Sequence, residues 1–186
     1  MRPATTTTVR RSRLHASRAA GLLAAALCLP AFAGGDYTFV NIADNTGPLG
    51  NSFFQPAINN NGRVAFGAGI GGGETGVFTG DGGPLTPIAL GDDTNFNVSY
   101  LIAMNDNDTV AVRVSESVLE EGIWTGNGGP LTLVVVNDDN PYSSCSLPDI
   151  NTPGQVVFHA FISGGTTGLY RAHGFGNYTT IADTTA

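Results

Sequence analysis

Two pairs of aspartates are the first residues whose type and spacing could do chemistry. Asp92-Asp93 and Asp138-Asp139 lie 46 residues apart, each after a short apolar run. Carboxylate oxygens are the ligands that Ca²⁺ prefers, so these four residues are candidate metal ligands on one rim of the fold. Asp also opens turns in solvated loops, and no EF-hand or nonapeptide spacing accompanies the pairs. We therefore assign no metal and no cofactor, and keep Ca²⁺ as the alternative.

The cysteine and the two histidines that follow the first 33 residues give little support for a nucleophilic or a zinc site. After the first 33 residues the only cysteine is Cys145, for which we predict a small buried apolar side chain. His159 and His173 lack companion ligands, whereas a zinc site needs three or four. The sequence contains no G-x-S-x-G or H-E-x-x-H motif and no phosphate-cradling loop. No catalytic residue is assigned, and enzymatic activity stays open with its absence favoured.

An oxygen-rich string at Asn105-Asp106-Asn107-Asp108 could also suggest a cation. The same positions read Asn59-Asn60-Asn61-Gly62 and Asn151-Thr152-Pro153-Gly154 elsewhere in the chain. A tight turn explains all three segments, and a cation explains one, because Gly, Asn and Asp tolerate positive φ. We predict a two-residue hairpin turn at Asn61-Gly62 and a type II turn at Pro153-Gly154.

These turns belong to a repeat with a period of 46 residues. The segment Ile58–Phe66 recurs as Met104–Val112 and as Ile150–Phe158. A second block, Gly76–Thr86, returns as Gly122–Thr132. A fixed period of this length is typical of repeat architectures. We place the repeats at about 51–94, 95–140 and 141–186, preceded by one strand at 37–43 whose Ile42-Ala43 echoes Ile88-Ala89.

Each repeat is predicted to form four short antiparallel strands. The runs are β-branched and aromatic, and Gly, Asn, Asp and Pro bound them. The second strand, such as Val64-Ala65-Phe66, is apolar on successive residues, which is typical of a strand buried on both faces. Phe78, Trp124 and Tyr170 share one slot in the third strand, where a core role is favoured over a sugar-binding platform.

The segment Asn59-x-x-Gly62-x-Val64-Ala65-Phe66 resembles the NxxGxVAF tandem-repeat family of exported bacterial proteins, which often carry a PEP-CTERM or other anchor. The repeat layout is also similar to TolB-like β-propeller blades. The resemblance covers about Tyr37 to the C-terminus and implies an all-β fold of propeller-like blades in an incomplete ring. The alternative is a threefold β-trefoil or prism, because three repeats are fewer than the usual four to eight blades.

The first 33 residues have the three parts of a secretory signal peptide. An Arg-rich segment is followed by a short apolar run and by Ala31-Phe32-Ala33, so we predict cleavage after Ala33. The repeat domain is then 34–186, which keeps three Arg against 15 acidic residues, a formal charge of −12. Such a surface repels phosphate, so nucleic acid is an unexpected partner, and no later stretch could span a membrane.

Three functions remain open at this stage. The first is an exported non-enzymatic β-repeat module, secreted, periplasmic or at the cell surface, that binds protein or glycan or is structural. The second is a small carbohydrate-active protein that uses acidic loop residues. The third is a fragment of a longer propeller protein. An open array would expose a blade face at each end, so a homodimer is a further expectation.

Overall fold

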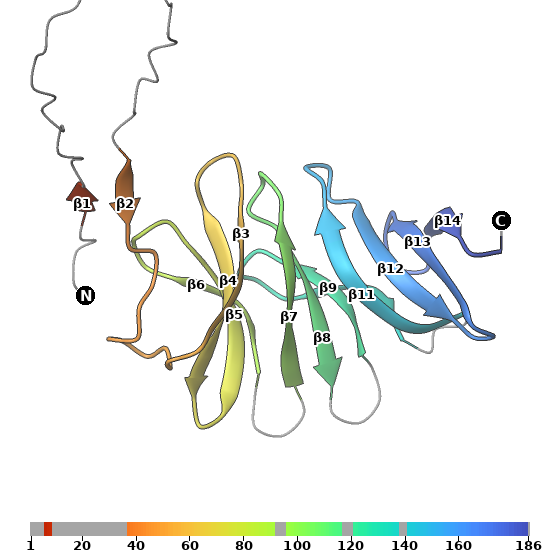
Figure 1. The fold of residues 1–186 in the computed structure, drawn as a ribbon, viewed down its shortest axis with the longest axis horizontal. Coiled ribbons are helices and arrows are strands. Elements are labelled where there is room, and N and C mark those ends of the chain that lie inside the picture. The colour runs from red at the N-terminus through yellow and green to blue at the C-terminus, as the bar shows by residue number, and fades with distance from the viewer. Residues whose placement is uncertain (1–5, 9–36, 92–95, 117–120, 138–140, 186) are drawn as a thin grey trace, which may run out of the picture. The chain divides into compact units, whose positions relative to one another are not determined.

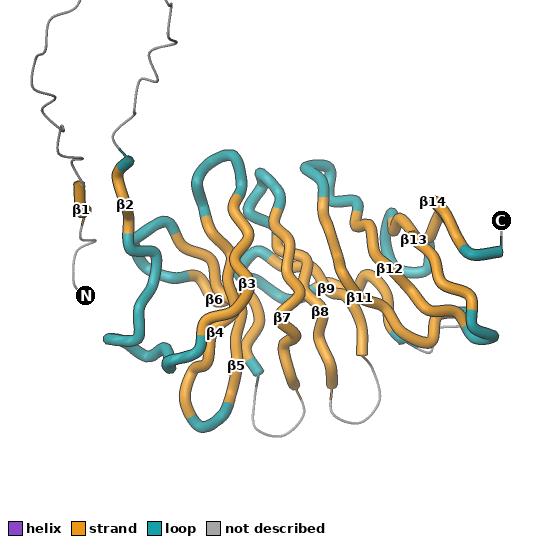
Figure 2. The backbone as a smooth tube through the Cα atoms, in the orientation of Figure 1, coloured by secondary structure: helices purple, strands orange, loops and turns teal. Residues whose placement is uncertain are grey.

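The computed structural model describes residues 6–8, 37–91, 96–116, 121–137 and 141–185. The chain divides into two compact units, residues 1–41 and 42–186. The smaller unit contains the antiparallel pair β1 (Thr6–Thr8) and β2 (Thr38–Val40). Within the described residues every regular element is a strand, so the all-β prediction is confirmed (Figure 2).

The larger unit contains three four-stranded antiparallel sheets, each built from one repeat (Figure 1). The first sheet consists of β3 (Phe53–Ile58), β4 (Val64–Gly71), β5 (Glu74–Gly80) and β6 (Thr86–Leu90). The second consists of β7 (Phe96–Met104), β8 (Val110–Glu116), β9 (Glu121–Gly126) and β10 (Thr132–Val136). The third consists of β11 (Tyr142–Ile150), β12 (Val156–Ile162), β13 (Thr166–Ala172) and β14 (Tyr178–Asp183). Strands adjacent in sequence pair with each other in every sheet.

The three sheets follow one another in chain order, and they do not close on themselves (Figure 1). Two apolar clusters lie between consecutive sheets, and a third lies where Leu49 and the segment at Ile42 pack against the first sheet. One cluster joins β4, β5 and β6 to β7 and β8, and another joins β8, β9 and β10 to the third sheet. The strand that begins each of the last two sheets packs against the sheet before it, so the sheets stack face to face.

Burial on both faces is confirmed for the second strand of the first two sheets. Ala65 and Phe66 are both buried, as are Ala111 and Val112. The shared aromatic slot also lies in the core, since Phe78 and Tyr170 are buried and Trp124 is partly buried against a core cluster. Cys145 is fully buried, as its prediction as an apolar core residue required.

The hairpin turns differ from the prediction in their type. Positive φ occurs at Gly62 (82°), Asp108 (60°) and Gly154 (86°), the position expected. The N–H of Gly62 donates to the carbonyl of Asn59, however, so Gly62 is the fourth residue of its turn and not a corner residue. The same bond recurs in the other two turns. A turn closed by one left-handed residue is the three-residue hairpin with a bulge, which replaces the predicted two-residue and type II turns.

A glycine in the third strand of the second and third sheets is required by close approach of the fourth strand's backbone, whereas at the equivalent Gly76 a Cβ would meet the side chains of Phe78 and Leu90. A Cβ on Gly168 would lie 2.7 Å from the carbonyl oxygen of Ala182, and one on Gly122 would meet the carbonyl oxygen of Val135. A register shift follows at this point in every sheet. The Gly-apolar-aromatic pattern of the repeat is therefore steric in origin.

The predicted strand at 37–43 is shorter in the structure. Only Thr38–Val40 is a strand, β2, while Ile42 belongs to the larger unit. Ile42 Cγ2 lies 3.6 Å from a Cβ built on Gly80, and Ile88 Cγ2 lies 3.5 Å from one on Gly126. The segment at Ile42 thus covers the first sheet as β6 covers the second, which agrees with the sequence echo.

Candidate functional site

The asparagines that open the first two hairpin turns each connect their sheet to the next. Asn59 Nδ2 donates to the carbonyl oxygen of Asn105 at 3.2 Å. Asn105 Nδ2 in turn donates to the carbonyl oxygen of Asn151 at 2.9 Å. The three residues are 46 positions apart, so one bond is repeated along the stack. We call Asn59, Asn105 and Asn151 the asparagine ladder.

Each ladder residue also organises its own turn. Asn105 Oδ1 accepts from the N–H groups of Asn107 and Thr109, both at 3.0 Å. Asn59 Oδ1 accepts two equivalent bonds within its turn. A buried amide must be satisfied on both its oxygen and its nitrogen, and Asn59 and Asn105 are buried. These asparagines therefore have a structural role.

The ladder ends at the third sheet. Asn151 Oδ1 accepts from Gln155 N at 2.8 Å, and the second bond of the other turns is missing because Pro153 has no N–H. Asn151 Nδ2 donates to Gln155 Oε1 at 2.9 Å, on the exposed surface and within its own turn. The donor that reaches the next sheet elsewhere is thus directed back at its own hairpin.

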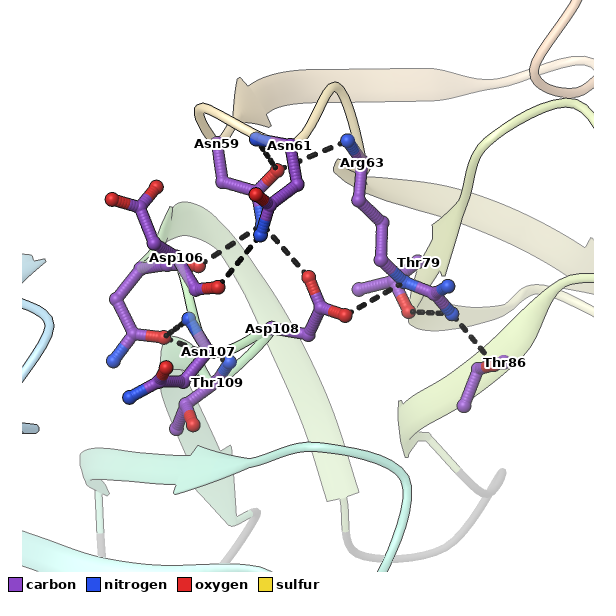
Figure 3. Close-up of polar contacts among 10 residues, drawn as sticks. Asn59, Asn61, Arg63, Thr79, Thr86, Asp106, Asn107, Asp108 and Thr109 are labelled. Atoms are coloured by element: carbon purple, nitrogen blue, oxygen red, sulfur yellow. Dashed lines mark hydrogen bonds and ion pairs between the residues drawn. The ribbon is translucent and has the colours of Figure 1, made fainter.

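The carboxylates of the oxygen-rich string accept hydrogen bonds across the first pair of sheets. Asp106 accepts from Asn60 N and from Asn60 Nδ2, both at 2.9 Å. The backbone bond, followed by the side-chain bond, lowers the pKa of Asp106 below its ordinary value. Asp108 Oδ1 accepts from Asn59 Nδ2 at 2.7 Å, and its other oxygen lies 3.8 Å from Arg63 Nε (Figure 3). Sequence reasoning assigned only a turn to these aspartates.

A second polar contact joins the second sheet to the third. Arg113 Nε donates to the carbonyl oxygen of Cys145 at 3.0 Å, and Cys145 N donates to Asn137 Oδ1 at 2.7 Å. Glu121 pairs with Arg113 and accepts from Asn137 Nδ2. Burial lowers the pKa of Arg113. Sequence reasoning missed this group, although an arginine inside the apolar run Val-Ala-Val-Arg-Val was a signal.

The third sheet leaves uncovered the face that the first two sheets bury. Val77, Ile123 and Leu169 occupy equivalent positions, and their exposed fractions are 1%, 0% and 44%. Phe161 and Ile181 are also exposed. We define the outer face of the third sheet by the side chains that point away from the second sheet: Val157, His159, Phe161, Leu169, Arg171 and Ile181.

The two histidines predicted as isolated residues have different partners: His159 lies in β12, and His173 lies in the turn between β13 and β14. His159 lies 3.4 Å from Ser146 Oγ, and its ring contacts Phe161 edge-on at 4.9 Å between centroids. His173 accepts from Arg171 Nε at 3.2 Å and lies 3.1 Å from Gln155 Nε2. The structure therefore does not bring the two imidazoles to one site.

Asp92, Asp93, Asp138 and Asp139 lie outside the described residues, as does the expected cleavage site at Ala33. Among the residues whose positions are described, no group of three or more His, Cys, Asp or Glu could hold a metal ion. In the same part of the chain no helix is long and apolar enough to cross a membrane.

The sheets and their asparagine ladder define an all-β repeat protein. A family model matches residues 52–184, which covers all three sheets. The chain belongs to this family, which is described as a family of unknown function (DUF7453). Searches of the curated proteins and of the solved structures gave no match.

Proposed function

We propose that this protein is an exported, non-enzymatic β-repeat module that binds another protein through the outer face of the third sheet. Its sheets are propeller-type blades of an incomplete ring, in keeping with the resemblance to the NxxGxVAF and TolB-like repeats. The acidic chain, with a formal charge of −12 after residue 33, disfavours nucleic acid as the ligand.

One observation carries the proposal: equivalent residues change from fully buried to exposed at the last sheet. Leu169 is 44% exposed where Val77 and Ile123 are covered by the following sheet. Monomeric proteins rarely leave contiguous apolar patches bare unless the patch binds something. The polar residues of the repeat motif, in contrast, are engaged in hydrogen bonds between sheets.

The apolar character of the outer face favours a protein ligand over a glycan. Its centre consists of Phe161, Leu169 and Ile181, with Arg171 and His159 among them. Interface centres are apolar and enriched in aromatic and arginine side chains. This composition supports protein binding.

Export follows from the leader. We propose that the protein is secreted, periplasmic or at the cell surface, and that it begins at Gly34 because Ala31 and Ala33 suit the peptidase subsites. The intact mass of secreted protein tests this step. A mass that retains the five leader arginines would contradict it.

A glycan array probed with and without Ca²⁺ tests the binding proposal. We expect no specific glycan signal in either condition. Ca²⁺-dependent glycan binding that is lost on Asp92→Asn or Asp138→Asn would instead favour the carbohydrate-active alternative. If the wild-type protein associates with another protein and the Leu169→Asp variant associates equally well, the outer face is not the binding site.

A further inference from the structure

We propose that the outer face of the third sheet binds the first sheet of a second copy of this chain, head to tail. The geometry would be the one that already joins consecutive sheets within the chain. This inference rests on the proposed function and names the partner of that site.

The first sheet offers the half of the interface that inserts. Ile58, Met104 and Ile150 are equivalent residues at the ends of β3, β7 and β11. Met104 and Ile150 pack into the clusters shared with the preceding sheet, and Ile150 is 7% exposed. Ile58 lies in the first sheet of the larger unit, and its exposed fraction is 69%. It is an apolar side chain that lacks the neighbours its equivalents have.

The third sheet offers the half that receives. Ile150 packs in one cluster with Ala111, Ile123 and Val134 of the second sheet. The equivalent residues of the third sheet are Val157, Leu169 and Ile181, and all three belong to the outer face. Suppose that the first sheet of a second copy packs on the third sheet in the way that the third sheet packs on the second. Ile58 of the second copy would then lie against these three side chains. The exposed Ile58 and the outer face are therefore complementary parts of an interface that the chain forms twice. Phe66 and Phe78 of the first sheet are buried in a cluster with Leu49, against which Ile42 and Ala43 pack.

The asparagine ladder would continue across the same junction. Asn59 and Asn105 each donate to the carbonyl of the next ladder residue. Within the described residues, Asn151 Nδ2 donates only to Gln155 Oε1, on the surface. In the head-to-tail arrangement its equivalent acceptor is the carbonyl oxygen of Asn59 in the second copy. The bond to Gln155 would be exchanged for the ladder bond.

Charges placed at this junction provide an independent argument. A Cβ on Gly128 would lie 2.7 Å from Thr86 Cγ2, so the β9–β10 turn contacts β6 of the preceding sheet. The equivalent contact would bring the turn at Asp81 of the second copy onto β14, beside Arg171. Asp81 replaces Asn127 of the internal turn, and Arg171 replaces a threonine, so this charge pair is absent from the corresponding internal contact. No carboxylate pairs with Arg171 in the described part of the chain.

Pairing of two outer faces with each other is the competing arrangement. It would bring two copies of Arg171 together and would leave Ile58 exposed. Like charges facing each other across an interface oppose association. The head-to-tail arrangement covers both ends and pairs opposite charges.

The segment at Ile42 modulates this association. Ile42-Ala43-Asp44 and Ile181-Ala182-Asp183 have the same sequence, and each Asp accepts from the N–H two residues later at 2.9 Å. Ile42 lies against Gly80, where Ile181 of a preceding copy would lie. The segment must therefore move aside, and Ile42→Ala should strengthen association.

Sedimentation velocity on the exported protein tests the inference with Ile58→Asp and Leu169→Asp. Both positions are exposed, so we expect both variants to fold. The wild-type protein should form dimers or longer assemblies, since head-to-tail interfaces give rings or filaments. Each variant alone should sediment as a monomer, and an equimolar mixture should give a one-to-one dimer, because one intact half remains on each chain. Phe175→Asp, an exposed apolar residue outside the outer face, is the matched control and should behave as wild type.

Three results would overturn the inference. They are a monomeric wild-type protein, a mixture that stays monomeric, and an Ile58→Asp variant that associates normally while Leu169→Asp does not. The last result would indicate pairing of two outer faces. If either variant fails to fold, the charge swap decides: Asp81→Arg and Arg171→Asp should each weaken association at least tenfold, and the double variant should restore it. A monomer without glycan binding would overturn this inference and leave the proposed function standing.

Discussion

Asp108→Gly separates two effects that act on one residue in opposite directions. Asp108 has a φ of 60°, and for most residues the left-handed region costs about 1–2 kcal/mol. Asp tolerates this region better than most residues, and Gly adds about 0.5–1 kcal/mol of chain entropy in the unfolded state. Backbone conformation alone would therefore make the variant neutral or slightly more stable.

The contacts between sheets reverse this expectation. Asp108 Oδ1 accepts from Asn59 Nδ2 at 2.7 Å, and a bond to a charged acceptor contributes about 1.5–3 kcal/mol. The Arg63 pair is 3.8 Å long and partly exposed, so it adds about 0–1 kcal/mol. Solvent exposure of Asp108 favours the lower values. We expect Asp108→Gly to reduce the free energy of unfolding by about 1–3 kcal/mol, a fall in Tm of about 3–10 °C.

Urea and thermal unfolding of the wild-type protein, Asp108→Gly and Asp108→Asn measure this effect. Asp108→Asn keeps an acceptor oxygen and tolerates positive φ, so it should lose less than about 1 kcal/mol. A double-mutant cycle with Asn59→Ala should give a coupling energy, because the two side chains are bonded. A neutral or stabilising Asp108→Gly, with no coupling to Asn59, would refute the reasoning.

Three further changes have definite expected outcomes. Gly122→Ala would push a Cβ into the backbone of β10 and should reduce the free energy of unfolding, measured in urea, by about 1–3 kcal/mol. The control Gly129→Ala, whose Cβ would have its nearest atom 4.0 Å away, should be neutral. Equal losses of stability in the two variants would contradict the steric role of Gly122. Leu147→Asn should raise the Tm slightly, because an exposed leucine with a φ of 51° is strained; a clear fall would mean that its side chain contributes to packing. The bonds from Asn60 lower the pKa of Asp106 in the folded protein, so the stability that they add is present above the ordinary pKa of 3.8 and is lost as the pH falls through the lower folded pKa. Asp106→Asn should therefore flatten the fall of Tm below pH 3.8. A profile of Tm against pH that is unchanged in this variant would contradict the reasoning.

The sequence predicted the parts of the fold that depend on local chemistry and on the repeat. The period of 46 residues gives the four strands of each sheet, and the residue types Gly62, Asp108 and Gly154 mark the position with positive φ. The turn type was wrong, because it depends on which carbonyl accepts the Gly62 N–H, and residue preference does not determine this. The strand expected at 37–43 reduced to Thr38–Val40.

Contacts between sheets were beyond the reach of sequence patterns. The bond from Arg113 to the Cys145 carbonyl joins residues 32 positions apart, and it exists only because β11 lies across the second sheet. The ladder bonds likewise depend on how closely consecutive turns stack. The sequence predicted that an open array exposes a sheet face at each end. It did not predict which residues form the outer face, because that depends on the direction in which the sheets stack. The leader, the cleavage site and the proposed partners stay predictions.

The exchange rates of side-chain amide protons, measured by NMR, test most directly whether the motif asparagines connect the sheets. In the Leu169→Asp variant, Asn59 and Asn105 Nδ2 protons should exchange roughly tenfold or more slowly than those of the exposed Asn127. The Nδ2 protons of Asn151, which is bonded to Gln155 on the exposed surface, should exchange fast in this variant and slowly in the wild-type assembly. Equal, fast exchange at Asn59, Asn105 and Asn127 would contradict the account.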